Sequence, residues 1–176
     1  MNEIQQLNNG RETGGTESVI EQQLVTFFID RELYGVAVLK VQEIIGMTQI
    51  IHVPNSLPYM KGVINLRGSV VPVVDMRTKF EIESRDYDSF TVILIVEVSG
   101  ILIGMIVDSV SDVVDVSVGS IQQTPHFSSN IDRDYISGIA RHGEELIIML
   151  DVDRILCPED LNEIDKSMPR QAREGL

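Results

Sequence analysis

The chain has 176 residues, of which 22 are Ile and 21 are Val but only 3 are Ala. Because β-branched side chains lose rotamer freedom in helices, whereas Ala is the best helix former, this composition excludes a helical bundle and favours a mainly β protein. The formal net charge of −13 disfavours nucleic acid and anionic lipid as partners, since both bind by attracting Lys and Arg.

The first 23 residues differ from the rest of the chain, because they are rich in Asn, Gln, Gly, Glu and Thr. This composition predicts a disordered leader. The leader lacks the basic start and apolar centre of a signal peptide, and no apolar run approaches the roughly 20 residues that span a bilayer. We therefore expect a cytoplasmic protein that does not insert into a membrane and is a monomer when free.

From Leu24 onward the pattern changes to short apolar runs of strand length, separated by Gly, Pro, Asn and Asp. These runs cover residues 24–29, 34–45, 69–74, 91–98, 101–108, 111–118 and 145–152. The two-residue separation at Ser99-Gly100 predicts a tight hairpin, and residues 30–32 predict another. Pro72 cannot donate to a β-ladder, so its strand is expected at an edge or bulge, where another chain could add.

Two short helices are expected near the ends of this pattern. Residues 54–62 (PNSLPYMKG) suggest a helical turn with Ser56 as its N-cap and Gly62 as its stop. Residues 158–176 suggest a C-terminal helix, over about 158–168, followed by a tail. The single cysteine, Cys157, has no partner for a disulfide and is interpreted as a buried structural residue.

An internal repeat links the two halves of the chain. Residues 59–80 align with residues 135–156 at an offset of 76, and residues 35–45 align with 104–114 at an offset of 69. The first alignment matches polar and glycine positions in register, namely Tyr59 with Tyr135, Gly62 with Gly138 and Asp75 with Asp151. The repeat predicts two similar small β-barrels packed together, built from about 24–90 and 91–157 with strands possibly exchanged between them.

No pattern of side chains indicates an enzyme, a metal site or a cofactor. The three histidines stand far apart, no nucleophile elbow or zinc motif is present, and the glycines of residues 62–68 precede a strand instead of a helix. The acids at 108, 112 and 115 are interpreted as solvated residues at strand ends. Arg67, between Leu66 and Gly68, has two open interpretations: a contact to a partner, or an internal pair with Glu43 or Asp75.

The segments YGVAVLKVQEII, PYMKGVINLRGSVVPVVDMRTKF, GMIVDSVSDVVDV, TPHF and YISGIA resemble the bacterial chemotaxis coupling protein family CheW over residues 22–157. The motif KGVxNLRGxVxPVxD is highly specific for that family. The resemblance implies a pair of five-stranded SH3-like barrels around a shared core. It also implies a non-catalytic adaptor that couples the cytoplasmic tips of methyl-accepting chemoreceptors to the histidine kinase CheA and helps to assemble their arrays.

By this resemblance, Val41, Glu43, Gly62 and Arg67 are expected on or beneath the receptor-binding groove. Phe127, with its neighbour Gln122, is expected at the contact with the regulatory domain of the kinase. Gln122 departs from the basic residue that would suit that contact, and the Phe127 ring folded back on its own barrel is the alternative. The same domain serving another receptor–kinase pathway, such as twitching motility, is the alternative at the level of function.

Overall fold

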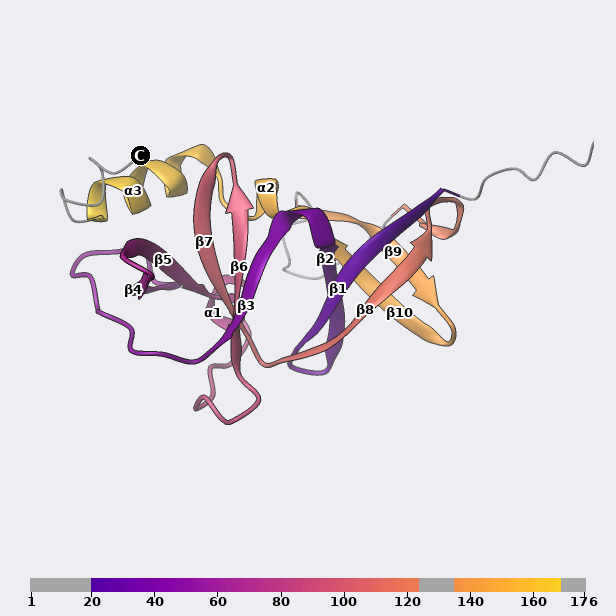
Figure 1. Cartoon of the computed structure of the whole chain (residues 1–176), viewed down its shortest axis with the longest axis horizontal. Helices are drawn as coiled ribbons and strands as arrows, with labels where there is room; N and C mark the ends of the chain where they lie inside the picture. Colours follow the sequence, from indigo (N-terminus) through magenta and orange to yellow (C-terminus); the bar gives the residue numbers. More distant parts are fainter. Residues whose placement is uncertain (1–19, 124–134, 169–176) are drawn as a thin grey trace, which may run out of the picture.

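The computed structural model describes residues 20–123 and 135–168 and contains two five-stranded β-sheets (Figure 1). The strands are β1 (Glu21–Ile29), β2 (Glu32–Ala37), β3 (Val41–Gly46), β4 (Met60–Leu66), β5 (Ser69–Asp75), β6 (Val92–Val98), β7 (Ile101–Val107), β8 (Ser109–Ser117), β9 (Ile136–His142) and β10 (Glu145–Leu150). The strand order is β8-β1-β2-β10-β9 in the first sheet and β3-β6-β7-β5-β4 in the second.

Each sheet takes strands from both copies of the repeat. The β1–β2 hairpin of the first copy lies in the first sheet with β8, β9 and β10, and the β6–β7 hairpin lies in the second sheet with β3, β4 and β5. Two parallel pairings, β2 with β10 and β5 with β7, join each hairpin to strands of the other copy. The two copies therefore exchange their hairpins.

The repeat is confirmed in the backbone. The amide of Asp75 donates to the carbonyl of Tyr59 and the amide of Asp151 donates to the carbonyl of Tyr135, both at 2.8 Å. Isolated bridges occur at equivalent places, Ile51 with Val63 and Gln122 with Ile139. The hairpin strands also share a constraint, because a Cβ on Gly35 or Gly104 would lie 2.8 Å from an isoleucine methyl group. Both glycines therefore allow close packing inside their sheets.

Three apolar clusters account for the packing. One cluster is formed by side chains of the first sheet, including Leu24, Ala140 and Ile147. A second cluster is formed by side chains of the second sheet. The largest lies between the two sheets and takes side chains from both. A row of rings crosses it, in the order Phe27, Tyr34, Phe80 and Tyr135, with centroids 5.3–6.1 Å apart. The expected fold class, mainly β with two packed SH3-like five-stranded barrels, is confirmed.

The described residues also contain five short helical segments: η1 (Val38–Lys40), η2 (Val118–Ser120), α1 (Met76–Lys79), α2 (Val152–Ile155) and α3 (Pro158–Ser167). The last of these confirms the predicted C-terminal helix, which buries Ile164 against the shared core. The helical turn predicted at 54–62 is wrong. Those residues form turns that lead into β4, and the Ser56 hydroxyl donates to the carbonyl of Val53 at 2.9 Å instead of capping a helix.

Two further expectations from single residues are wrong. The strand that contains Pro72 is not an edge strand, because β5 lies between β7 and β4. Its pairing with β7 begins only at Val73, so Pro72 needs no donor on that side. Cys157 is exposed, because it precedes α3 at the surface instead of packing in a core. Among the described residues, no helix combines the length and the apolar character needed to cross a bilayer.

Candidate functional site

Arg67 stands at the tip of a tight turn between β4 and β5. Leu66 pairs with Ser69, and both intervening residues have positive φ, 51° at Arg67 and 88° at Gly68. These angles correspond to a two-residue turn of the primed type that suits the twist of a hairpin. The Asn65 side chain accepts a hydrogen bond from the Gly68 amide at 2.7 Å and fixes the turn. The turn therefore presents an Arg67 side chain that is 74% exposed.

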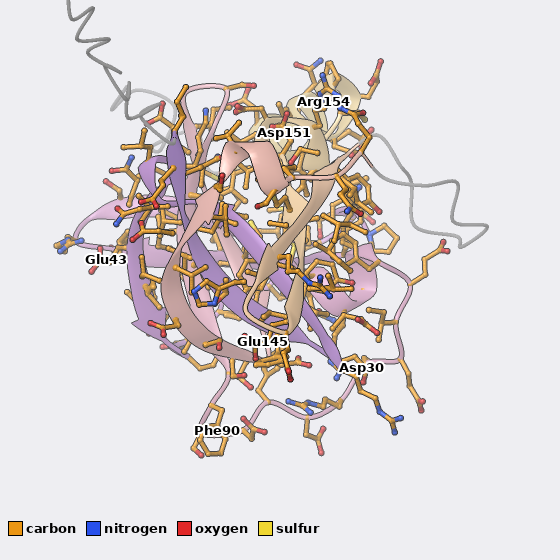
Figure 2. All side chains as sticks on the ribbon, turned by 90° about the vertical axis from the view of Figure 1, so that its right-hand side faces the viewer. Asp30, Glu43, Phe90, Glu145, Asp151 and Arg154 are labelled. Atoms are coloured by element: carbon orange, nitrogen blue, oxygen red, sulfur yellow. The ribbon has the colours of Figure 1, made fainter. Side chains whose placement is uncertain are left out.

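Glu43 lies on β3, an end strand of the second sheet that pairs only with β6. A register shift between Val41 and Glu43 marks a bulge, which bends the strand at this point. The guanidinium of Arg67 donates to the Glu43 carboxylate, so an ion pair connects β3 to the β4–β5 turn. Figure 2 shows Glu43 at the outer edge of the molecule.

The internal pairing that the sequence left open is therefore with Glu43 and not with Asp75. Asp75 instead caps α1 and accepts a hydrogen bond from the Tyr87 hydroxyl. Ion pairs as exposed as Arg67–Glu43 contribute at most about 1 kcal/mol to stability. The fold thus loses little if either side chain turns to a partner.

Gly62 and Val41, the other two residues expected at the receptor groove, are fixed by contacts of their own. Gly62 has a φ of +145°, and a Cβ there would lie 2.0 Å from the carbonyl oxygen of Ile51. The segment that carries Ile51 can cross β4 only because position 62 lacks a side chain. Val41 is half-buried and packs against the shared core. Of the four residues expected at the receptor groove, the structure thus brings Arg67 and Glu43 together, whereas Gly62 lies against Ile51 and Val41 against the shared core.

Gln122, one of the two residues expected at the kinase contact, lies in another part of the fold. Gln122 belongs to the first sheet's side of the molecule, where its backbone exchanges two 2.9 Å hydrogen bonds with Ile139. Its side chain is exposed. Phe127 lies outside the described residues. The two proposed contacts therefore concern different parts of the fold.

A buried ionic cluster of Arg77, Asp108 and Asp30 lies between the sheets and was not expected from the sequence. Asp108 was interpreted as solvated, but its side chain is only 11% exposed and accepts hydrogen bonds from Arg77 Nε at 2.9 Å and Nη2 at 2.7 Å. The amide of Asp30, in the β1–β2 turn, donates to the same carboxylate at 2.7 Å. Burial alone raises the pKa of Asp108, but these donors outweigh it and hold the pKa below its usual value.

A second ion pair occupies the equivalent place on the other side of the repeat. Lys40 of η1 lies 2.8 Å from Asp153 of α2, which also accepts a hydrogen bond from the Ser99 amide. Here the helix supplies the acid and the link between strands supplies the base, the reverse of Arg77 and Asp108. Both partners are about two-fifths exposed. Sequence offers one signal for these pairs, since Arg77 and Asp153 align at the repeat offset of 76.

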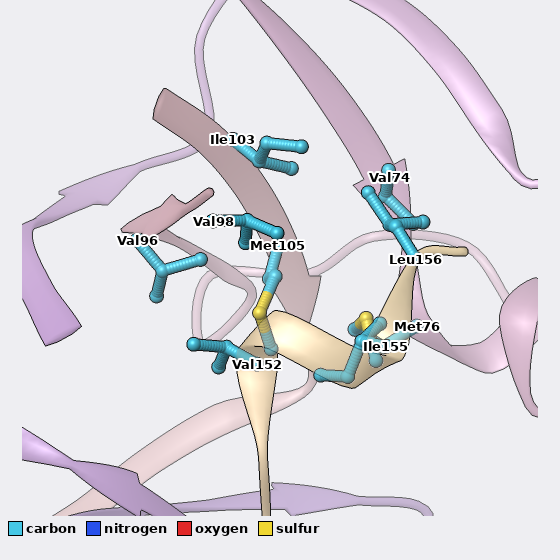
Figure 3. A pocket seen from close by; sticks show the side chains of 9 residues that line it. All are labelled: Val74, Met76, Val96, Val98, Ile103, Met105, Val152, Ile155 and Leu156. Atoms are coloured by element: carbon cyan, nitrogen blue, oxygen red, sulfur yellow. The ribbon is translucent and has the colours of Figure 1, made fainter. Parts of the chain in front are cut away.

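A cavity between the second sheet and α2 carries no chemistry. Nine apolar side chains line it, among them Val74, Val96 and Met105 (Figure 3), and its volume of about 10 Å³ is that of one water molecule. It is a small packing gap in the shared core. Within the described part of the chain, no three His, Cys, Asp or Glu side chains are grouped so as to hold a metal ion.

Comparisons with known proteins agree with this arrangement. The CheW-like domain matches residues 23–158. The chemotaxis protein CheW of Klebsiella aerogenes is 34% identical over 146 residues, which are 83% of this chain and 88% of that protein. The CheW of Bacillus subtilis is 28% identical over 151 residues, covering 86% of this chain and 95% of that protein.

A solved structure shows the same fold. The crystal structure of the scaffolding protein CheW from Thermoanaerobacter tengcongensis matches with a TM-score of 0.75 and 30% identity, and the match covers 80% of this chain and 96% of that one. The domain match spans all ten strands of both sheets, from residue 23 within β1 to the start of α3. The chain therefore belongs to the CheW-like domain family.

Proposed function

We propose that this protein is a non-catalytic adaptor that couples the cytoplasmic tips of chemoreceptors to the histidine kinase CheA in bacterial chemotaxis. Family membership supports the proposal, since relatives that align along most of this chain are named chemotaxis proteins and the solved relative is named a scaffolding protein. The protein would act in the cytoplasm and be recruited to receptor arrays at the membrane. It would hold no cofactor.

The exposed Arg67–Glu43 pair carries the receptor half of the proposal. Arg67 projects from a rigid turn, and its guanidinium can exchange the Glu43 carboxylate for an acidic or carbonyl group of a receptor. A charged, forked donor suits the polar helices of a receptor tip.

The kinase half rests on the separation of the two groups of residues. Gln122 is exposed on the side of the first sheet, whereas Arg67 belongs to the second sheet. An adaptor must bind two partners at once, so its two contacts need separate surfaces. We propose Gln122 and Phe127 for the contact with the regulatory domain of CheA.

A reconstitution tests this function. Vesicles that carry receptor cytoplasmic fragments are mixed with purified kinase and sedimented, with and without this protein. Coupling predicts that kinase sediments with the vesicles only when the protein is present, and that its phosphorylation rate then depends on the receptor's signalling state. Sedimentation of the protein alone, without kinase, would contradict the adaptor function. If receptors and kinase from a twitching-motility system recruit the protein instead, the protein belongs to that pathway.

A further inference from the structure

Arg67 occupies a backbone conformation that disfavours a side chain. Its φ of +51° lies in the left-handed region, where Cβ crowds the following carbonyl oxygen and glycine is the usual residue. At the repeat offset of 76, Arg67 aligns with Gly143, the first residue of the turn between β9 and β10, which has a φ of +61°. The second copy of the repeat thus makes the same turn position with glycine and without strain.

Only the backbone angle distinguishes the two positions. A Cβ at Gly143 would meet nothing within 4 Å, so crowding does not favour glycine there. The Arg67 side chain is 74% exposed, so burial does not favour arginine at the equivalent place. Disfavoured angles persist only where neighbouring contacts hold them, and they concentrate at functional sites. The strain at Arg67 therefore indicates a use for its side chain.

Hairpin turns that begin with a residue other than glycine at positive φ share a second feature. In the described part of the chain these turns begin at Asp30, Arg67 and Ser99, with φ of 50–56°. In each turn a side-chain oxygen accepts a hydrogen bond from one backbone amide. The bonds run from the Asp30 amide to Asp108 at 2.7 Å, from the Ser99 amide to Asp153 at 3.3 Å and from the Gly68 amide to Asn65 at 2.7 Å. A side-chain acceptor therefore accompanies the left-handed residue in all three.

The Arg67 turn differs from the other two in the origin of its acceptor. Asp108 and Asp153 come from other elements, whereas Asn65 belongs to β4, the strand that enters the turn. Arg141 aligns with Asn65 in the hairpin that contains Gly143, and an arginine side chain has no acceptor. The acceptor at position 65 is therefore paired with the strained arginine and is replaced where glycine removes the strain.

The direction of the Arg67 side chain matters because it connects the two end strands of the second sheet. In the order β3-β6-β7-β5-β4, the turn extends one end strand, β4, and Glu43 lies on the other, β3. The guanidinium reaches the Glu43 carboxylate only if it leaves the turn toward β3. A turn that moved freely would present the guanidinium in many directions, and ordering it on binding would cost affinity.

We propose that Asn65 is a positioning residue for Arg67. Its hydrogen bond to the Gly68 amide holds the turn in the left-handed conformation, so the guanidinium is already directed toward β3 when a receptor binds. This role rests on the receptor contact proposed above for Arg67. Asn65 acts through the backbone and contributes to receptor affinity by preorganisation.

The test compares Asn65→Ala with Asn65→Asp in the full chain. The amide–Hα coupling and the Cα chemical shift of Arg67, measured by NMR, report its φ, and calorimetry with a receptor-tip fragment gives the affinity. In Asn65→Ala we expect both NMR values to leave the left-handed range and affinity to fall about fivefold, which corresponds to one hydrogen bond of about 1 kcal/mol. Asn65→Asp keeps the acceptor and should restore both. Glu97→Ala, at the same position of the β6–β7 hairpin, should change neither.

Wild-type receptor affinity in Asn65→Ala, or weaker binding with an unchanged Arg67 backbone, overturns the positioning role, as does an Asn65→Asp variant that binds no better than Asn65→Ala. Arg67→Ala distinguishes this failure from failure of the receptor contact, because wild-type affinity of Arg67→Ala would overturn the contact itself. Arg67→Gly tests the strain. It loses the same ion pair as Arg67→Ala, but only alanine keeps the strain, so Arg67→Gly should have the higher melting temperature. An equal or lower melting temperature overturns the proposal.

Discussion

Arg77 and Asp108 form a buried ion pair that ties the second sheet to the first. Arg77 follows β5 at the start of α1, Asp108 links β7 to β8, and their nearest atoms lie 2.7 Å apart. The same carboxylate accepts the Asp30 amide from the tip of the β1–β2 hairpin. Because the two copies of the repeat exchange hairpins, this one carboxylate connects segments that belong to both.

Removing one partner of this pair should destabilise the protein strongly. Arg77→Met leaves the buried Asp108 carboxylate with only the more distant cation of Arg85, at 3.8 Å, and loss of one partner of a buried pair typically costs about 3–5 kcal/mol. Lys40→Met removes the equivalent pair with Asp153 and should cost much less, because solvent screens an exposed pair. Urea denaturation of both variants measures the two free energies of unfolding. Equal losses in the two variants would show that burial does not distinguish the pairs.

The pair also predicts a dependence of stability on pH. The folded-state pKa of Asp108 lies below its unfolded value, so its contribution is complete above the unfolded pKa and is lost as pH falls through the folded one. The loss therefore begins below about pH 4. Free energies of unfolding measured from pH 7 to pH 3 should fall more steeply for the wild type than for Asp108→Asn. Parallel curves would exclude Asp108 as the group responsible.

Gly62→Ala should destabilise the second sheet. A methyl group at this position would meet the Ile51 carbonyl, and the positive φ adds backbone strain. Strain of this kind costs about 1–3 kcal/mol, or roughly 2–10 °C in melting temperature for a chain of this size. Gly46→Ala is the matched control, because a Cβ at Gly46 meets nothing within 4 Å. Melting temperatures that fall equally in both variants would contradict the steric explanation.

The repeat explains why so much of the fold could be predicted from the sequence. Gly62 and Gly138 align because both need positive φ beside a crossing segment, and Asp75 and Asp151 align because both cap a helix. A local requirement of this kind selects one residue type at one position, so it can be recognised in the sequence. Short apolar runs rich in Val and Ile similarly marked the strands, and the hairpin at Ser99-Gly100 followed from its turn residues.

Features that depend on distant neighbours could not be predicted. Pro72 suggested an edge strand, but β5 lies between β7 and β4. This order of strands could not be inferred from the residues around Pro72. Asp108 looked like a solvated acid because its partner, Arg77, is 31 residues away in sequence. The Arg67 side chain had two possible internal partners, and only the bend of β3 brings Glu43 within reach.

Phe127→Ala addresses the kinase contact. A large ring anchored in a partner's pocket typically contributes about 2 kcal/mol or more to binding, so affinity for the kinase regulatory domain should fall roughly thirtyfold. Thermal unfolding should be unchanged, and receptor-tip binding should remain at the wild-type level. A lower melting temperature with equal loss of both partners would indicate that the ring packs on its own barrel. Wild-type kinase affinity with normal melting would reject the assignment altogether.

Affinity for a purified receptor-tip fragment, measured by titration calorimetry for Arg67→Ala and Glu43→Lys, tests the adaptor account most directly. Both side chains belong to an exposed pair, so unfolding free energies should change by less than about 1 kcal/mol. The account predicts that receptor affinity falls about tenfold or more in each variant, while kinase affinity is preserved. Wild-type affinity of both variants for the receptor tip would contradict it.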